Sequence, residues 1–192
     1  MTPSLRVVGL ERTAAESGEV ELLAGDFATC ATLGPTAVVR AMNVLRGYRE
    51  DEVPAIHAAL GAALIEGGLV LEGSTDTDGH VTVVSLLRRR GQAVRREALL
   101  FHTDFSRGFS PWLFRDWLPR DLRRRAQPGT PIHELLTRWD SGATGSTPRE
   151  RFLNSVPGVL EATSWELAHG FARWSALSPT LSPAGERGSV SE

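Results

Sequence analysis

The stretch "LRVVGLERTA", Leu5–Ala14, opens the part of the chain that decides the fold. Its first part, Leu5–Leu10, is almost continuously apolar, which is typical of a strand buried on both faces of a parallel sheet. Glu11 follows this strand directly. A second apolar run, Val20–Leu23, leads within three residues to Asp26. We therefore expect two buried strands near the start of the chain, each followed by a carboxylate.

Beyond these strands the pattern alternates between strand and helix. Ala37–Leu45 is a third strand-like run. Residues 50–52 are all acidic and open a helix, because the helix dipole favours acids in the first turn. Four apolar residues then recur at helical spacing: Val53, Ile56, Leu60 and Leu64. Gly67-Gly68 is expected to end this helix, and Leu69–Leu71 to form the next strand, which ends at Glu72-Gly73.

The later part of the chain predicts a hairpin followed by helices. Val81–Leu87 and Ala93–His102 are β-rich runs separated by a short arginine- and glycine-containing segment, a spacing typical of an antiparallel hairpin. Helices are expected to begin at Ser110-Pro111, at Thr130-Pro131 and at the capping box Thr147-Pro148-Arg149-Glu150, with a last helical stretch from about Val159 to Leu177.

This order of elements predicts an α/β fold with a mostly parallel sheet and a terminal antiparallel hairpin at its edge. We expect a core over residues 1–105 and a helical C-terminal extension over residues 106–177. Residues 178–192 are rich in proline, glycine and serine, a composition that favours a disordered tail.

The composition bounds the class of protein. A chain of 192 residues that is 41% hydrophobic and 23% charged resembles a soluble globular domain. No apolar run is long enough to cross a bilayer, and no signal-peptide pattern opens the chain. The single cysteine, Cys30, excludes an internal disulfide, and neither it nor the histidines show metal-ligand spacing. We expect a reducing, cytoplasmic setting, no metal, and no membrane partner.

Four pieces in their order resemble the later part of a class I S-adenosylmethionine-dependent methyltransferase: "LRVVGLE", "ELLAGDF", "VVRAMNVLRGY" and "LIEGGLVLEGS". The resemblance covers about Leu5 to Trp139 and implies a Rossmann-like sheet with S-adenosyl-L-methionine as cofactor. It implies that Glu11 binds the cofactor ribose and that Asp26 lies near the adenine amino group. It further implies that Phe27 packs on the adenine ring and that Asn43 lies beside the transferred methyl group.

Each of these residues also has a plainer interpretation. Glu11 is a carboxylate that can accept two hydrogen bonds from a cis-diol, or a solvated acid at a helix start. Asp26 follows a glycine and is equally a turn residue, and Phe27 is equally a core side chain. Asn43 has no signal apart from the resemblance. His102, at the end of the hairpin, is a further candidate for a catalytic role.

The family's first strand has no counterpart in this sequence. In the family this strand carries a glycine-rich turn and lies between the second and fourth strands, whereas here no GxGxG occurs and four residues precede Leu5. Losing about eight ladder bonds at buried groups, at about 1–3 kcal/mol each, would exceed a typical net stability of about 5–15 kcal/mol. We therefore expect an N-terminally shortened methyltransferase with compromised cofactor binding, unless strands two and four pair directly or a partner supplies a strand.

The charge is uneven along the chain. Residues 88–125 hold 11 arginines against 4 acids, whereas residues 1–87 hold 5 against 12. Such an arginine excess can bind phosphates, and nearby tryptophans can stack on bases. The favoured interpretation is that these arginines lie on exposed faces and balance the acidic front half, with the aromatic residues in the core. Binding of nucleic acid is therefore not expected.

Two functions stay open from the sequence. The first is methyl transfer to an unknown acceptor, which depends on positioning and needs no fixed acid–base pair. The second is a non-catalytic binding or interaction module derived from the same fold. The sequence names no catalytic residue, methyl acceptor or oligomeric state.

Overall fold

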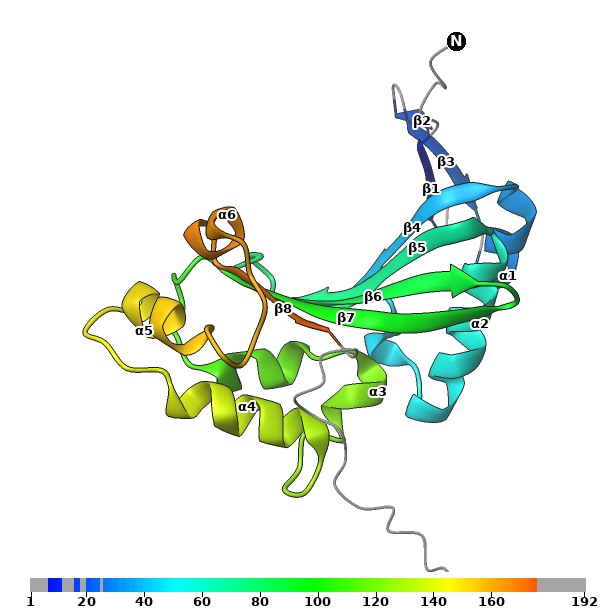
Figure 1. Cartoon of the computed structure of the whole chain (residues 1–192). Coiled ribbons are helices and arrows are strands. Elements are labelled where there is room, and N and C mark those ends of the chain that lie inside the picture. The colour runs from blue at the N-terminus through cyan, green and yellow to red at the C-terminus, as the bar shows by residue number, and fades with distance from the viewer. Residues whose placement is uncertain (1–6, 12–15, 18–19, 25, 176–192) are drawn as a thin grey trace, which may run out of the picture.

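A computed structural model describes residues 7–11, 16–17, 20–24 and 26–175 of the chain (Figure 1). Side chains are described from Asp26 onward, except those of Ala28 and Leu33. The side chain of Glu11 and the predicted tail over 178–192 lie outside this description.

Five strands form an open mixed sheet in the order β4-β5-β6-β7-β8. They are β4 (Thr36–Met42), β5 (Leu64–Thr75), β6 (Val81–Arg90), β7 (Ala93–Thr103) and β8 (Phe171–Ser175). The α/β class and the antiparallel β6–β7 hairpin are confirmed, but the hairpin does not form the edge of the sheet, because β8 pairs with β7. Of the four neighbouring strand pairs in this sheet, only β4–β5 is parallel. The expectation of a mostly parallel sheet is therefore wrong for these strands. The physical reason is the short connection over residues 76–80, because a parallel neighbour of β5 would need a long crossover.

The first two predicted strands pair with each other in a separate small sheet. β1 (Val7–Glu11) runs parallel to β3 (Val20–Ala24), and the two-residue strand β2 (Glu16–Ser17) lies on the other side of β3. β1 and β4 therefore each lie at the edge of their own sheet. The short helix α1 (Phe27–Cys30) and the 3₁₀ helix η1 (Ala31–Leu33) connect β3 to β4.

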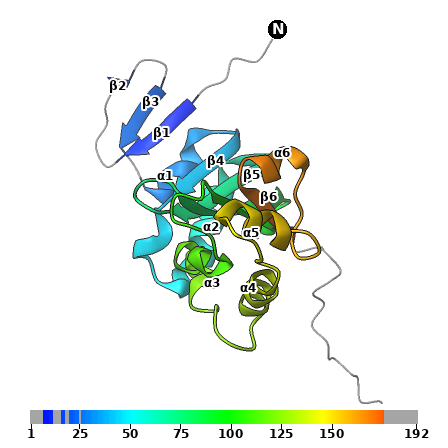
Figure 2. The same ribbon diagram turned by 90° about the vertical axis from the view of Figure 1, so that its left-hand side faces the viewer.

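Helices cover one face of the five-stranded sheet (Figures 1 and 2). One end of that face packs against α2 (Val53–Ala62), which follows η2 (Leu45–Gly47) and η3 (Glu50–Glu52). The other end packs against η4 (Pro111–Trp117), α3 (Arg120–Arg123), α4 (Pro131–Ser141) and α5 (Pro148–Ser155). Trp139 of α4 is fully buried at the centre of this second cluster. The sheet thus has two apolar clusters on one face.

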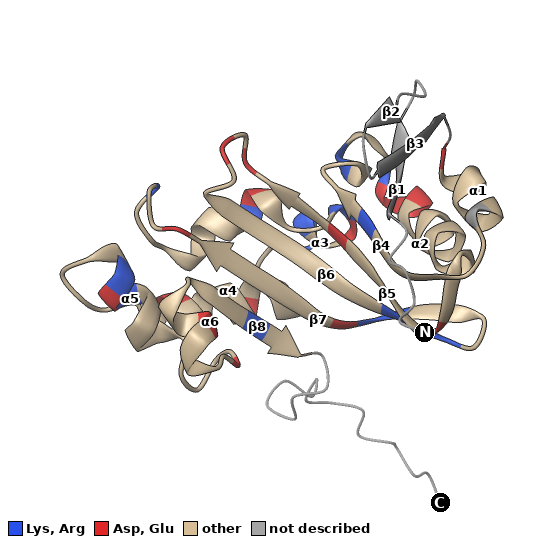
Figure 3. Ribbon diagram, turned by 90° about the horizontal axis from the view of Figure 1, so that it is seen from above, with Lys and Arg blue, Asp and Glu red and all other residues tan. Residues whose placement is uncertain are grey.

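On the opposite face no described helix lies over β5, β6 and β7 (Figure 3), whereas α6 (Ser164–Ala168) lies beside β8, where Trp165 stacks on Phe171. Successive side chains of a strand point to opposite faces. Val70, Val83 and Leu99 are buried under the helices, so the residues between them in each strand point to the other side. These side chains are only partly buried and mostly apolar: Leu69, Leu71, Val84, Leu86 and Leu100. We call this surface the open face.

Two helix predictions need correction. α2 ends at Ala62, and Leu64 begins β5 instead of closing the helix. Gly67 does adopt a positive φ, 77°, but inside the strand, beside a shift in the β4–β5 register. Of the predicted helix from Val159 to Leu177, the described residues up to Ser175 contain only α6 (Ser164–Ala168). The chain then becomes β8, because Phe171–Ser175 completes the edge of β7.

Candidate functional site

Three strands of the main sheet end at the same edge. β4 is parallel to β5, and β7 shares that direction because both β5 and β7 are antiparallel to β6. The segments after these strands are Asn43, Asp76–His80 and Asp104–Arg107. Ligands of open α/β sheets bind outside the carboxyl ends of parallel strands. We therefore take this carboxyl edge as the candidate site.

Asn43 ties the ends of β4 and β5 together. Its backbone N–H donates to the carbonyl of Gly73 at 2.8 Å, and its Oδ1 accepts from the backbone N–H of Thr75 at 2.9 Å. The residue has a φ of 60°, a left-handed conformation that asparagine tolerates better than most residues. Its side-chain nitrogen has no hydrogen-bond partner among the described residues.

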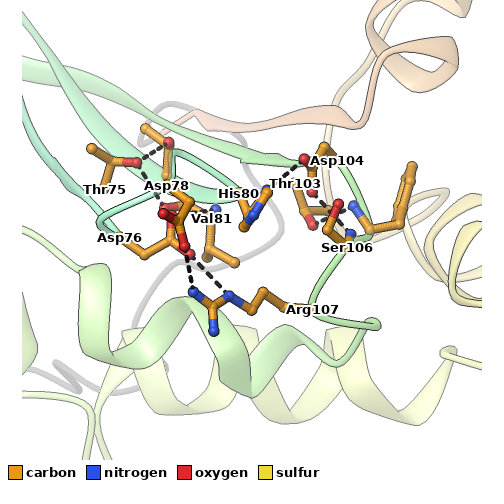
Figure 4. Close-up of polar contacts among 11 residues, drawn as sticks. Thr75, Asp76, Asp78, His80, Val81, Thr103, Asp104, Ser106 and Arg107 are labelled. Carbon is orange, nitrogen blue, oxygen red and sulfur yellow. Dashed lines mark hydrogen bonds and ion pairs between the residues drawn. The ribbon is translucent and has the colours of Figure 1, made fainter.

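Arg107 links the turn after β5 to the loop after β7 (Figure 4). Its Nε lies 3.3 Å from Asp76 Oδ2, and its Nη2 donates to Asp78 Oδ2 at 3.1 Å. Asp76 is nearly buried and also accepts the backbone N–H of Val81 at 3.2 Å. Two carboxylates and one guanidinium leave this group with a net charge of −1.

A histidine and a carboxylate form a close pair at the same edge. His80 Nδ1 lies 2.7 Å from Asp104 Oδ2 (Figure 4). The backbone N–H of Ser106 donates to Asp104 at 2.9 Å. That hydrogen bond, followed by the one with His80, lowers the pKa of Asp104 to about 2. Asp104 is therefore ionised at neutral pH, and in the neutral imidazole it accepts the Nδ1–H of His80, so that Nε2 is the acceptor in that form.

The loop that carries Asp104 is held in a strained conformation. Phe105 has a φ of 68°, and its backbone N–H donates to Thr103 Oγ1 at 3.0 Å. The backbone N–H of Thr103 donates to the carbonyl of Gly170 at 3.0 Å. In the described part of the chain, Asn43 and Phe105 are the two non-glycine residues with positive φ. Both flank the carboxyl edge, and strain of this kind clusters at functional sites.

A small open pocket lies beside Asp76 and Arg107, on the helix side of the edge. Its volume is about 220 Å³, and its lining residues are Asp76, Thr77, Val81, Arg107, Leu113 and Trp117. Trp117 also lies under the guanidinium of Arg46, which is 4.4 Å from the ring centroid. The volume is below the roughly 300–1,000 Å³ of pockets for drug-sized ligands.

Two of the predicted cofactor residues hold local structure. Asp26 caps α1, where its carboxylate accepts the backbone N–H of Thr29 at 3.1 Å. Phe27 is half-buried on the α2 cluster, with its ring 5.4 Å from that of Tyr48. The contact with Tyr48 brings Phe27 against the segment that follows β4. Asp26 is thus a helix N-cap, where a turn residue was the plainer prediction, and it is exposed; Phe27 packs partly into the core.

His102 packs into the sheet. Its ring lies 4.3 Å from that of Phe171 on β8, and burial lowers its pKa. The sequence did not lead us to predict His80 or Asp104 as site residues. The predicted hairpin carries the signal that could have identified this pair. A turn centred near Gly91 places residues 80 and 104 almost opposite each other, just beyond Val81 and Thr103.

The remaining candidates have structural surroundings. Cys30 is buried, and burial raises the pKa of its thiol. Phe114 is buried in the α4 cluster, and Trp112 and Trp117 pack against it. The arginine-rich segment pairs with acids: Arg88 with Glu97, Arg96 with Asp121, and Arg125 with Glu50. Among the described residues, no group of histidine, cysteine or acidic side chains could hold a metal, and no helix is long and apolar enough to cross a membrane.

No family model matches this chain, and comparisons with curated proteins and with solved structures find no match. We therefore infer function from the fold and from the carboxyl edge.

Proposed function

We propose that this chain is a Rossmann-like, S-adenosylmethionine-dependent methyltransferase whose cofactor site is the carboxyl edge beside β4. The observation that carries the proposal is the strand pairing. β1 pairs in parallel with β3, β4 pairs in parallel with β5, and β1 and β4 each form a sheet edge. In methyltransferases the second and fourth strands, here β1 and β4, flank the first strand. The two edges therefore match the positions that the resemblance predicts.

The described candidate residues are compatible with the cofactor. Asn43 has amide hydrogens that no described residue accepts, and Asp26 is exposed. Phe27 is half-buried, so part of its ring remains available for stacking on a purine. When bound, S-adenosylmethionine supplies a methyl group on a positively charged sulfur. The task of these side chains is to bind and orient the nucleoside at the ends of β3 and β4.

Calorimetry with S-adenosylhomocysteine tests the cofactor site. Because the sequence contains no glycine-rich GxGxG turn, we expect weakened but measurable binding to the wild-type chain. Glu11→Ala should lose a further amount of about 1.5–3 kcal/mol of binding free energy, the value of a hydrogen bond to a charged group. Glu11→Gln serves as the matched control, because it keeps an acceptor oxygen and removes the charge. Equal affinities in wild type and Glu11→Ala would remove Glu11 from the site.

Replacing Asn43 by aspartate separates its structural role from a role in binding. Aspartate keeps the oxygen that accepts the N–H of Thr75, and it tolerates the left-handed conformation. We expect a melting temperature close to wild type. The affinity for S-adenosylhomocysteine should fall by about 0.5–1.5 kcal/mol, the net value of one hydrogen bond. An unchanged affinity in Asn43→Asp would mean that its amide nitrogen does not contact the cofactor.

The open face favours the second candidate function, a non-catalytic interaction module. Val38 on the edge strand β4 is 50% exposed, next to the half-buried leucines of β5. Exposed apolar surface of this kind is typical of interaction sites. Failure to bind S-adenosylhomocysteine, together with concentration-dependent association in sedimentation, would favour this module over the enzyme.

The arginine-rich segment is not expected to bind nucleic acid at physiological salt. Arg123 and Arg125 are each paired with an acid, Asp116 and Glu50, which reduces the positive charge available to phosphates. We expect no sub-micromolar binding in a mobility-shift titration at about 150 mM salt, since salt weakens phosphate contacts steeply. Tight binding that is abolished when Arg123, Arg124 and Arg125 become alanine would contradict this and promote the interaction module.

A further inference from the structure

We propose that His80, oriented by Asp104, accepts the proton of a phenolic hydroxyl on a ligand that lies on the open face. The binding site follows from the geometry of the sheet. Its use as the methyl-acceptor site rests on the proposed function, because a phenolate is a nucleophile that such a transfer needs.

The pair is built to hold one tautomer of the imidazole. Asp104 is ionised and accepts from both the Ser106 N–H and His80, so its carboxylate is fixed at two points. The His80 contact uses Nδ1, and no described residue forms a hydrogen bond or ion pair with Nε2. A carboxylate that holds Nδ1–H keeps the lone pair on Nε2, the arrangement that makes an imidazole a general base. The side chain of His80 is 30% exposed, so Nε2 is accessible to a ligand.

Strand alternation places this pair on the open face. Val81 and Thr103 are directly paired and buried on the helix side. His80 and Asp104 lie one residue beyond the ends of these strands, where the Asp104 N–H donates to the His80 carbonyl at 3.2 Å and continues the pairing, so we place their side chains on the other side. Their next neighbours on that side are Thr82 and His102, which are also directly paired. The charge of Asp104 acts on His102, although burial still lowers the pKa of that ring.

The floor next to the pair is apolar. Beyond Thr82 and His102, the next paired residues on the open face are Val84 and Leu100, both half-buried. Phe171 extends the floor across β8, where it stacks near His102. At the β8 end this surface is bounded by α6, where Trp165 stacks on Phe171 with ring centroids 6.1 Å apart, and no described helix lies over Val84 and Leu100 (Figure 3). A flat apolar group can lie on these side chains with one polar atom at His80.

The surrounding charges decide which polar atom fits. Asp76, Asp78 and Asp104 disfavour a ligand that arrives as an anion, such as a carboxylate or phosphate. A phenol arrives neutral, and its negative charge develops only beside the imidazolium of His80. A hydroxyl donates to Nε2 with no charge to desolvate. A phenol, with a pKa of about 10, is acidic enough for an imidazole to share its proton, whereas an alkyl alcohol is far less acidic.

The proton step is simple. The hydroxyl proton passes to Nε2 of His80, which becomes an imidazolium stabilised by Asp104, and the electron pair of the broken O–H bond stays on oxygen. The product is a phenolate on the open face, beside the ends of β5 and β7. The proton returns to solvent when His80 is deprotonated again.

The test uses 4-nitrophenol, whose visible absorption reports its ionised form. The wild-type chain should bind it and raise the ionised fraction at a pH below that of half-ionisation in water. His80→Ala should weaken binding by at least about tenfold, as expected for one charge-assisted hydrogen bond, and abolish the change in ionisation. Asp104→Asn, which keeps an acceptor oxygen and loses the charge, should still bind but with a smaller ionised fraction.

His133→Gln, on α4 away from this edge, is the control and should behave as wild type. Thermal melting of His80→Ala confirms that the variant is folded. Undetectable binding to wild type, or equal binding and ionisation in wild type and a folded His80→Ala, would overturn the proposal. The outcome is separable from the cofactor test: 4-nitrophenol binding that depends on His80 without S-adenosylhomocysteine binding would keep this site and reject the methyltransferase function.

Discussion

Replacing Trp139 by alanine should lower the free energy of unfolding by about 3–5 kcal/mol, the range for large aromatic residues lost from a core. The side chain is fully buried in the cluster that joins the helices to the sheet. Its ring stacks on Phe114 at a centroid distance of 5.2 Å and meets Phe101 of β7 edge-on at the same distance. Urea denaturation followed by tryptophan fluorescence and circular dichroism measures the loss.

A second variant separates packing from hydrogen bonding at this position. The indole N–H of Trp139 donates to Ser155 Oγ at 2.9 Å, and both groups are buried. Ser155→Ala leaves the ring in place and its N–H without that partner, which should cost about 1–3 kcal/mol. A smaller loss of unfolding free energy in Trp139→Ala than in Ser155→Ala would contradict this prediction. It would mean that the packing of α4 on the sheet does not depend on the Trp139 ring.

Gly170→Ala should detach β8 from the sheet. Gly170 has a φ of 74°, and a Cβ atom there would overlap the backbone carbonyl oxygen of Thr103. Neither atom can move without breaking the hydrogen bond from the Thr103 N–H to the Gly170 carbonyl. The strain of the left-handed residue alone is about 1–3 kcal/mol, and the overlap adds to it. We expect a marked fall in the melting temperature and faster amide exchange in β8.

Gly79→Ala is the matched control for this substitution. Gly79 has a similar φ of 81°, but a Cβ there would meet no atom within 4 Å. Its variant should show the cost of the backbone conformation alone, about 1–2 kcal/mol. Equal losses in the two variants would contradict the close approach of Gly170 to Thr103.

Strands and turns of the main sheet were predictable because their signals are local. The alternating pattern of Val81–Leu87 and Ala93–His102, with Gly91 between them, defines a hairpin without reference to other segments. The pairing partner of a strand is not local. Phe171–Ser175 resembles the end of a helix in sequence, yet it becomes β8 because the edge of β7 is available to it. Leu64 likewise fits a helical pattern, which a short apolar run cannot distinguish from a strand.

The candidate site was predictable only in part. The apolar pattern predicts a strand through Leu45, whereas β4 ends at Met42, so the position of Asn43 at a strand end is implied only by the resemblance. Its hydrogen bond to Thr75 depends on how β4 and β5 align. His80 and Asp104 lie 24 residues apart, and only the hairpin register brings them together. Their chemistry is therefore a property of the folded sheet, and neither residue carries a motif of its own.

The most direct test of the account is an NMR titration of the labelled chain with S-adenosylhomocysteine. If the cofactor binds at the carboxyl edge, the backbone signals of Asp26, Phe27, Asn43 and Thr75 should shift together and saturate with one dissociation constant. Signals of α4 and α5, on the far part of the helical cover, should stay unchanged. Saturating ligand that shifts none of the four signals, or shifts only residues elsewhere, would contradict the proposed methyltransferase site.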